Sequence, residues 1–171
     1  MVKSTFTLLV LSMAVLLFSF SLSVYKSPAN SVKTTYLNNL DSFIQQVKLL
    51  QAILQSGNKK ELQGQFLKTR VSYKRIEGVI EYFFDSYATV LNGPPIPFFE
   101  EKEPYKLENE PLGMQVIEGY VFPGYNSTYK PALEYQITEM LGHLVRLPDV
   151  NEPFEFNDAN IFDAVIEEMY R

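Results

Sequence analysis

An apolar stripe with helical spacing, between residues 32 and 54, constrains the fold more than any other feature of this chain. Its members recur in alternating steps of three and four, the period of one helix face. They are Val32, Tyr36, Leu37, Leu40, Phe43, Ile44, Val47, Leu50 and Leu54. Ser31 is a suitable N-cap, and Gly57 suits the left-handed position after a helix. We therefore predict a helix from Ser31 to Gln55 that buries one face against a partner helix.

A second helix is predicted from Lys60 to Leu91, because the same spacing resumes directly after the short connection. A connection of this length makes the two helices antiparallel neighbours. Gly64 and Gly78 lie inside the second helix. Each interior glycine costs about 1 kcal/mol relative to alanine, so either position is a candidate kink or close helix crossing.

The segment at 93–110 is predicted to be an acidic, proline-rich loop. A structural turn made of Asn92, Gly93, Pro94 and Pro95 ends the preceding helix, because glycine tolerates positive φ and proline cannot continue the hydrogen-bond ladder. The segment holds five glutamates and two lysines. It lacks the alternating ligands and central glycine of an EF-hand, which favours a solvated loop over a calcium site.

Three shorter helices are expected to complete the chain, over 111–122, over 131–147 with Pro148 as its stop, and from a cap at Asn157 to Arg171. The expected fold is all-α, an antiparallel bundle of about five helices over residues 31–171. The last apolar stripe runs to the final residue without a glycine or proline exit. This pattern predicts a bundle left incomplete at its C-terminus, in a chain that is the front part of something longer.

The first residues have the pattern of a targeting segment. Lys3 precedes an apolar run from Phe6 to Phe20, and small residues follow at Ser21 and Ser23. This pattern predicts a signal peptide at 1–23, followed by a linker at 24–30. The alternative is an uncleaved N-terminal anchor, since the stretch is long enough to cross a bilayer core of roughly 30 Å. Both predict export, to the periplasm or cell envelope, with membrane contact only through this segment.

Composition excludes several classes of function. The chain has no cysteine, which rules out disulfides, thiolate metal sites and covalent attachment of haem c. Its net charge is −5, whereas nucleic-acid binding depends on an excess of lysine and arginine. We therefore expect no nucleic-acid partner.

The single histidine, His143, gives no basis for a metal or catalytic site. Its nearest carboxylate on a helix is Glu139, one turn earlier. Metal sites recruit three or four ligands, so one pair is insufficient. No catalytic, cofactor-binding or metal-binding residue is predicted in this chain.

A polar stripe on the second helix is the strongest candidate for an organised cluster. Arg70, Tyr73 and Glu77 fall at i, i+3 and i+7 and share a face with the apolar residues. A charged group removed from water needs a partner. We therefore predict a buried polar network that Gln115 and Glu118 of the next helix complete.

Three parts of the sequence resemble a known family. They are FLKTRVSYKRIE at 66–77 with IEYFF at 80–84, LNGPPIP at 91–97, and EPLGMQVIE at 110–118. Their order and spacing resemble the N-terminal helical region of dihaem cytochrome c peroxidase-like proteins of Bacteroidetes. The resemblance covers roughly 62–122. It implies a periplasmic protein whose helical region precedes two haem c domains that reduce hydrogen peroxide.

This chain departs from that family because it has no Cys-x-x-Cys-His motif. Haem c is therefore implied only for downstream domains that the chain lacks, and no catalytic residue carries over. The expected function is an accessory or docking domain, with haem domains in cis or a partner protein. The chain would be either a fragment of such an oxidoreductase or a free-standing copy of its helical domain.

Two alternatives remain open. Imelysin-like proteins of periplasmic iron handling are also helical and exported, but their Gly-x-His-x-x-Glu motif is not matched by the adjacent Gly142 and His143. A stand-alone helical interaction module fits the aromatic-rich helices equally well.

Overall fold

The computed structural model describes residues 27–102, 105–150 and 156–170. The predicted signal peptide or anchor at 1–23 lies outside these residues. The elements in order are α2 (Pro28–Ser56), α3 (Lys59–Lys74), α4 (Glu77–Phe83), α5 (Asp85–Asn92), β1 (Phe98–Lys102), β2 (Tyr105–Asn109), α6 (Met114–Val121), η1 (Ser127–Tyr129), α7 (Lys130–Val150) and α8 (Asp158–Met169). The predicted all-α bundle is confirmed, with one small hairpin added. Among the described helices, none combines the length and apolar character needed to cross a membrane.

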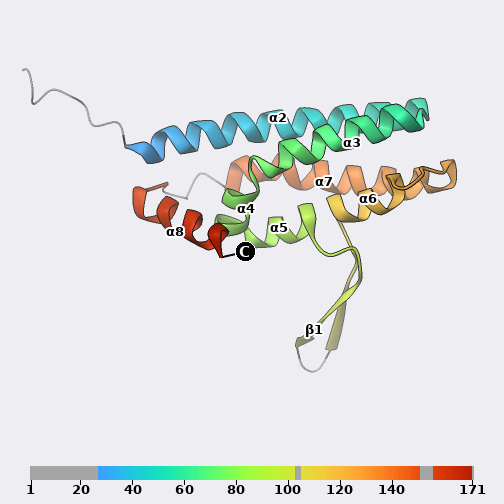
Figure 1. Cartoon of the computed structure of the whole chain (residues 1–171). Coiled ribbons are helices and arrows are strands. Elements are labelled where there is room, and N and C mark those ends of the chain that lie inside the picture. The colour runs from blue at the N-terminus through green and yellow to red at the C-terminus, as the bar shows by residue number, and fades with distance from the viewer. Residues whose placement is uncertain (1–26, 103–104, 151–155, 171) are drawn as a thin grey trace, which may run out of the picture.

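The bundle has an up-down-up-down course (Figure 1). α2 and α3 form an antiparallel hairpin, α5 and α6 lie end to end and run parallel to α2, and α7 returns beside them. We call α5 and α6 together the split helix. α7 also packs on α2, and α3 packs on α6. Four rods, namely α2, α3, the split helix and α7, therefore enclose one core. α8 lies at one end, against α4 and α2.

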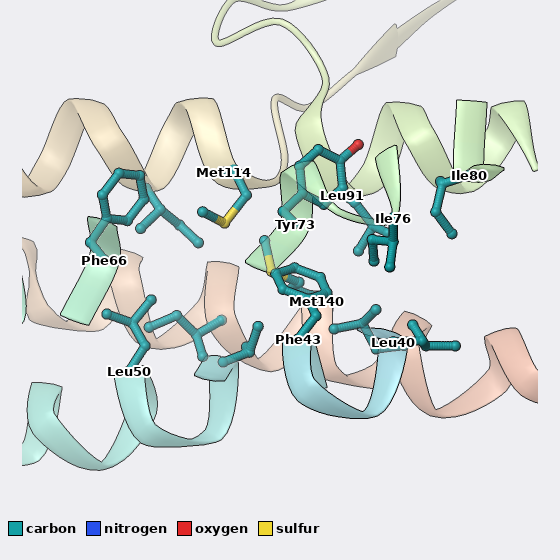
Figure 2. Close-up of a cluster of buried hydrophobic side chains, with 14 of the residues drawn as sticks. Leu40, Phe43, Leu50, Phe66, Tyr73, Ile76, Ile80, Leu91, Met114 and Met140 are labelled. Atoms are coloured by element: carbon teal, nitrogen blue, oxygen red, sulfur yellow. The ribbon is translucent and has the colours of Figure 1, made fainter. Parts of the chain in front are cut away.

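Side chains from every rod meet in the core (Figure 2). Figure 2 shows Phe43 of α2, Tyr73 of α3 and Met140 of α7 converging beneath the split helix. All three are at most 1% exposed. Burying apolar side chains of this size stabilises the fold by about 1.5–3 kcal/mol each relative to exposure. Six members of the stripe predicted for α2 are buried in this core, whereas Leu37 is 37% exposed.

The first helix begins earlier than predicted. Its N-cap is Ser27, whose Oγ accepts a hydrogen bond from the backbone N–H of Ala29 at 3.2 Å. Pro28 occupies the first helical position, where its missing N–H removes no helical bond. The prediction of Ser31 as cap and of a linker reaching residue 30 was therefore wrong. At the other end Gly57 adopts φ 70°, the left-handed conformation expected of it.

The predicted helix from Lys60 to Leu91 is in fact three helices, and the chain reverses direction within it (Figure 1). α3 ends at Lys74, and the non-helical Phe84, at φ −140° and ψ 50°, separates α4 from α5. The reversal places Ile80 and Leu91 in the same core as α3. The apolar spacing predicts which residues face the core, but it does not predict where the chain reverses direction.

A β-hairpin replaces the predicted acidic loop at 93–110. β1 and β2 pair antiparallel, with Glu101 directly opposite Lys106. Aromatic residues at 98, 99 and 105 have a high strand propensity. The hairpin projects away from the helices (Figure 1). The prediction of a loop was wrong because it considered the acidic residues and prolines of this segment but not the strand propensity of its aromatic residues.

Close backbone contact joins the two parts of the split helix. A Cβ on Gly113 would lie 2.5 Å from the carbonyl carbon and oxygen of Leu91, and Gly113 has φ 96°. Gly93 is extended rather than left-handed, at φ −62°, but a Cβ there would lie 2.2 Å from the carbonyl oxygen of Thr89. Both glycines are therefore required for space, at the two points where the hairpin leaves and rejoins the bundle.

The remaining boundaries shift by a few residues. α6 begins at Met114 rather than Pro111, because the left-handed Gly113 precedes it. α7 continues to Val150, so Pro148 does not stop it; a proline there removes one hydrogen bond in the last turn. Asn157 caps α8 as predicted, accepting from the N–H of Asn160 at 2.9 Å. α8 ends at Met169.

Replacing Gly113 with alanine is expected to destabilise the protein by more than about 2 kcal/mol, because the new Cβ meets backbone and the residue is left-handed. Gly119→Ala is the matched control, since Gly119 lies within α6, the helix that Gly113 precedes, and has open space around it. That control should be neutral or stabilising, by up to about 1 kcal/mol. Urea unfolding measures both, and equal midpoints for the two variants would contradict the end-to-end arrangement.

Candidate functional site

The five predicted polar residues lie at the junction of α3, α4 and the split helix, but they do not form one cluster. Arg70 Nη1 lies 2.9 Å from Glu118 Oε2 and joins α3 to α6. The two side chains are 34% and 42% exposed. The prediction that this pair is buried was therefore wrong, because the long arginine side chain reaches to the rim of the helix interface.

Glu77 lies in a second cluster, in which its own side chain is 8% exposed while that of Lys74 is 53% exposed. The whole Glu77 residue is 6% exposed. Lys74 Nζ donates to both carboxylate oxygens, with a distance of 2.7 Å to Oε1. Asn92 Nδ2 donates to the same Oε1 at 3.3 Å. The carboxylate of α4 is therefore held between the end of α3 and the end of α5.

Gln115 extends this cluster to the other side of the hairpin. Its Nε2 donates to the backbone carbonyl oxygen of Asn92 at 2.9 Å. The series Lys74, Glu77, Asn92 and Gln115 thus connects α3, α4, α5 and α6, and we call it the junction network. Sequence reasoning missed the roles of Lys74 and Asn92 in it. Lys74 was given no role and Asn92 was assigned to a turn. Lys74 is an i,i+3 neighbour of Glu77, and the chain reversal between α3 and α5 brings Asn92 to the same carboxylate.

Tyr73 belongs to the core. It is 1% exposed, and its ring centroid lies 5.5 Å from that of Phe43. The aromatic ring therefore packs between α2 and α3 and contributes mainly apolar burial.

Another polar contact lies where the hairpin rejoins the bundle. Gln136 of α7 accepts from the Gly113 N–H at 3.1 Å and donates to the Pro111 carbonyl oxygen at 3.0 Å. Gln136 is 7% exposed. A buried side chain amide that satisfies two backbone groups fixes the chain at this point. Sequence inspection gave no signal for it, because the amide lies within an otherwise ordinary helix.

The described residues contain no group of three or more histidine, aspartate and glutamate side chains that could hold a metal. His143 is half-buried on α7, with its ring edge-on to Tyr87 at 6.1 Å between centroids. The junction network pairs its carboxylate with an ammonium and an amide. Its geometry is that of a structural clamp.

Two hollows lie elsewhere on the surface. One is a shallow groove of about 400 Å³ between α2 and α3, with Leu67, Lys68, Val71 and Arg75 in its lining. The other, of about 200 Å³, lies between α4 and α8, with Val79, Phe83, Ile161 and Val165 in its lining.

The comparisons with known proteins give no relative. The chain matches no protein-family model, no curated protein and no solved structure.

The two ion pairs offer a matched test of burial, because Lys74→Met and Arg70→Met each remove the cation of one pair on α3. Lys74→Met removes a half-exposed ammonium from the buried Glu77 carboxylate, which keeps only the Asn92 amide, and should cost about 1–3 kcal/mol. Arg70→Met leaves Glu118 at a half-exposed site and should cost about 0–1 kcal/mol. Urea unfolding at neutral pH measures both losses. Equal losses for the two variants would show that the junction network does not hold Glu77 as described.

Proposed function

We propose that this protein is a helical accessory domain that binds the haem-bearing domains of a dihaem cytochrome c peroxidase-like protein and has no turnover of its own. The observation that carries the proposal is the hairpin of β1 and β2, which projects from the bundle (Figure 1). The proposal includes export to the periplasm or cell envelope, where such peroxidases act.

The hairpin has the properties of a docking element. A two-stranded hairpin alone is marginally stable in water, so a projecting one gains stability when a partner covers it. Its outer edges carry unpaired backbone donors and acceptors, which can add a strand from another protein. The five paired positions from Phe98 to Lys102 provide an edge of useful length.

The bundle presents this hairpin from a fixed base. Gly113 contacts the backbone of Leu91, and Gln136 of α7 binds both sides of the point of return. The two ends of the insertion are therefore held together by α5, α6 and α7. A rigid base lowers the entropy lost when the hairpin binds a partner.

Contacts among the three segments that carry the resemblance support the proposed place of docking. Arg70 and Glu77 lie in the first segment that carries the resemblance, Asn92 in the second, and Gln115 and Glu118 in the third. Hydrogen bonds and an ion pair connect these three segments. The residues that resemble the family therefore surround the base of the hairpin, which is the region that the proposal assigns to docking.

Removing the hairpin should abolish binding while preserving the bundle. Replacing residues 96–110 with a short Gly-Ser linker leaves the Leu91–Gly113 contact intact, so the unfolding midpoint should change little. Affinity for the dihaem peroxidase purified from the same organism should fall at least tenfold, which equals about 1.4 kcal/mol. Isothermal titration calorimetry measures the affinity.

The matched control is Val145→Glu, an exposed position on α7 away from the hairpin, which should bind like the unaltered chain. Equal affinity with and without the hairpin would contradict the docking role of the hairpin. Absence of binding by the unaltered chain would contradict the proposed function.

The chain by itself should carry no covalent haem and show no peroxidase activity, because it has no thiol to form thioether bonds. Haem staining after denaturing electrophoresis and an assay of peroxide consumption check this. A haem-stained band at the mass of the chain would overturn the accessory role.

A further inference from the structure

α8 has an exposed apolar face. Its members follow the spacing i, i+3, i+4, i+7 and i+8, which places them on one side of the helix. They are Phe162, Val165, Ile166, Met169 and Tyr170, and their exposed fractions run from 51% to 88%. Val165 lies at the edge of this face, because it also lines the hollow between α4 and α8. An apolar stripe this wide normally faces a core or a partner.

The contacts of α8 with the bundle keep this apolar face directed toward solvent. Asp158 Oδ1 accepts from Ser27 Oγ at 2.8 Å and from the N–H of Ala29 at 3.1 Å, which ties the start of α8 to the start of α2. On its inner side the Glu168 carboxylate lies 3.7 Å from where a Cβ on Gly78 would be. α8 is therefore held against α4 and α2 by its other face, and the apolar stripe cannot turn inward without breaking these contacts.

The groove between α2 and α3 has a complementary form. Leu67 and Val71 line it and are 53% and 57% exposed. Hydrogen bonds from Gln65 and Thr69 to the carbonyl oxygen of Gln46 hold the two helices together beside it. The groove therefore has fixed walls and an exposed apolar lining, which suits the apolar face of a helix.

The charges of the two surfaces are opposite. α8 carries four acidic and no basic residues, with Asp163 beside its apolar face. α3 carries five basic residues and one acidic residue. Lys68 and Arg75 line the groove, and neither has an ion-pair partner among the described residues. Opposite potentials favour this encounter, whereas two acidic α8 helices would repel each other.

We propose that α8 of one copy of this chain occupies the α2–α3 groove of a second copy. The contact is heterologous, because two different surfaces of the same chain meet. It goes beyond the proposed function, since the hairpin takes no part in it.

Sedimentation velocity of the unaltered chain and of three variants tests the proposal. The degree of association is measured at concentrations from about 1 to about 200 μM, the range in which weak association is detected. Phe162→Glu alters the α8 face, Val71→Glu alters the groove, and Val145→Glu is the control at an exposed position outside both. All three positions are exposed, and circular dichroism checks that each variant is folded. The unaltered chain and Val145→Glu should self-associate, whereas Phe162→Glu and Val71→Glu should each weaken association at least tenfold.

An equimolar mixture of Phe162→Glu and Val71→Glu should associate again, as one-to-one dimers held by a single contact, because the first variant keeps an intact groove and the second an intact α8. Restored association in the mixture supports the proposal. Monomeric behaviour of the unaltered chain over the whole range overturns it. Loss of association in Phe162→Glu but not in Val71→Glu also overturns it, because the α8 faces would then pair with each other. None of these outcomes depends on the peroxidase, so they are separate from the test of the proposed function.

Discussion

The contact between Gly113 and the backbone of Leu91 is the constraint on which the rest of the arrangement depends. It lets two helices of eight residues each act as one rod of the bundle. Isolated helices of this length are unstable in water, so each depends on packing against α7 and on the other. The same contact brings the two ends of the inserted hairpin together. Without it, α3 and α7 would lose the rod that closes the core between them.

The junction network adds specificity to this packing. Lys74 is an i,i+3 neighbour of Glu77 and would stay within reach of it in a continuous helix. The Asn92 amide reaches the buried Glu77 carboxylate only because the chain reverses between α3 and α5; a continuous helix through residues 74–92 would carry Asn92 away. Buried charges of this kind contribute little net stability, but they disfavour alternatives in which they lose their partners. The network therefore favours the conformation in which the chain reverses between α3 and α5 over a continuous helix, which the apolar pattern also permits.

Sequence reasoning predicted the helical class, the α2–α3 turn at Gly57 and the Asn157 cap, because each depends on local spacing or a single residue type. It missed the reversal between α3 and α5, since the apolar stripe through Ile80 is the same in either direction. It placed Arg70, Glu77, Gln115 and Glu118 near one junction, because a charged residue on an apolar face demands a partner. It missed Lys74, although this residue is an i,i+3 neighbour of Glu77, and it could not find Gln136, whose role arises only from tertiary contacts.

The central claim is that a stable bundle presents the hairpin as its docking element, and hydrogen–deuterium exchange with and without the dihaem peroxidase tests it most directly. In the free chain, amides of α2, α3 and α5–α7 should be protected, and those of β1 and β2 should exchange much faster. Adding the peroxidase should slow exchange chiefly in β1 and β2. If peroxidase binding leaves exchange in β1 and β2 unchanged and slows it elsewhere on the bundle, the account is contradicted.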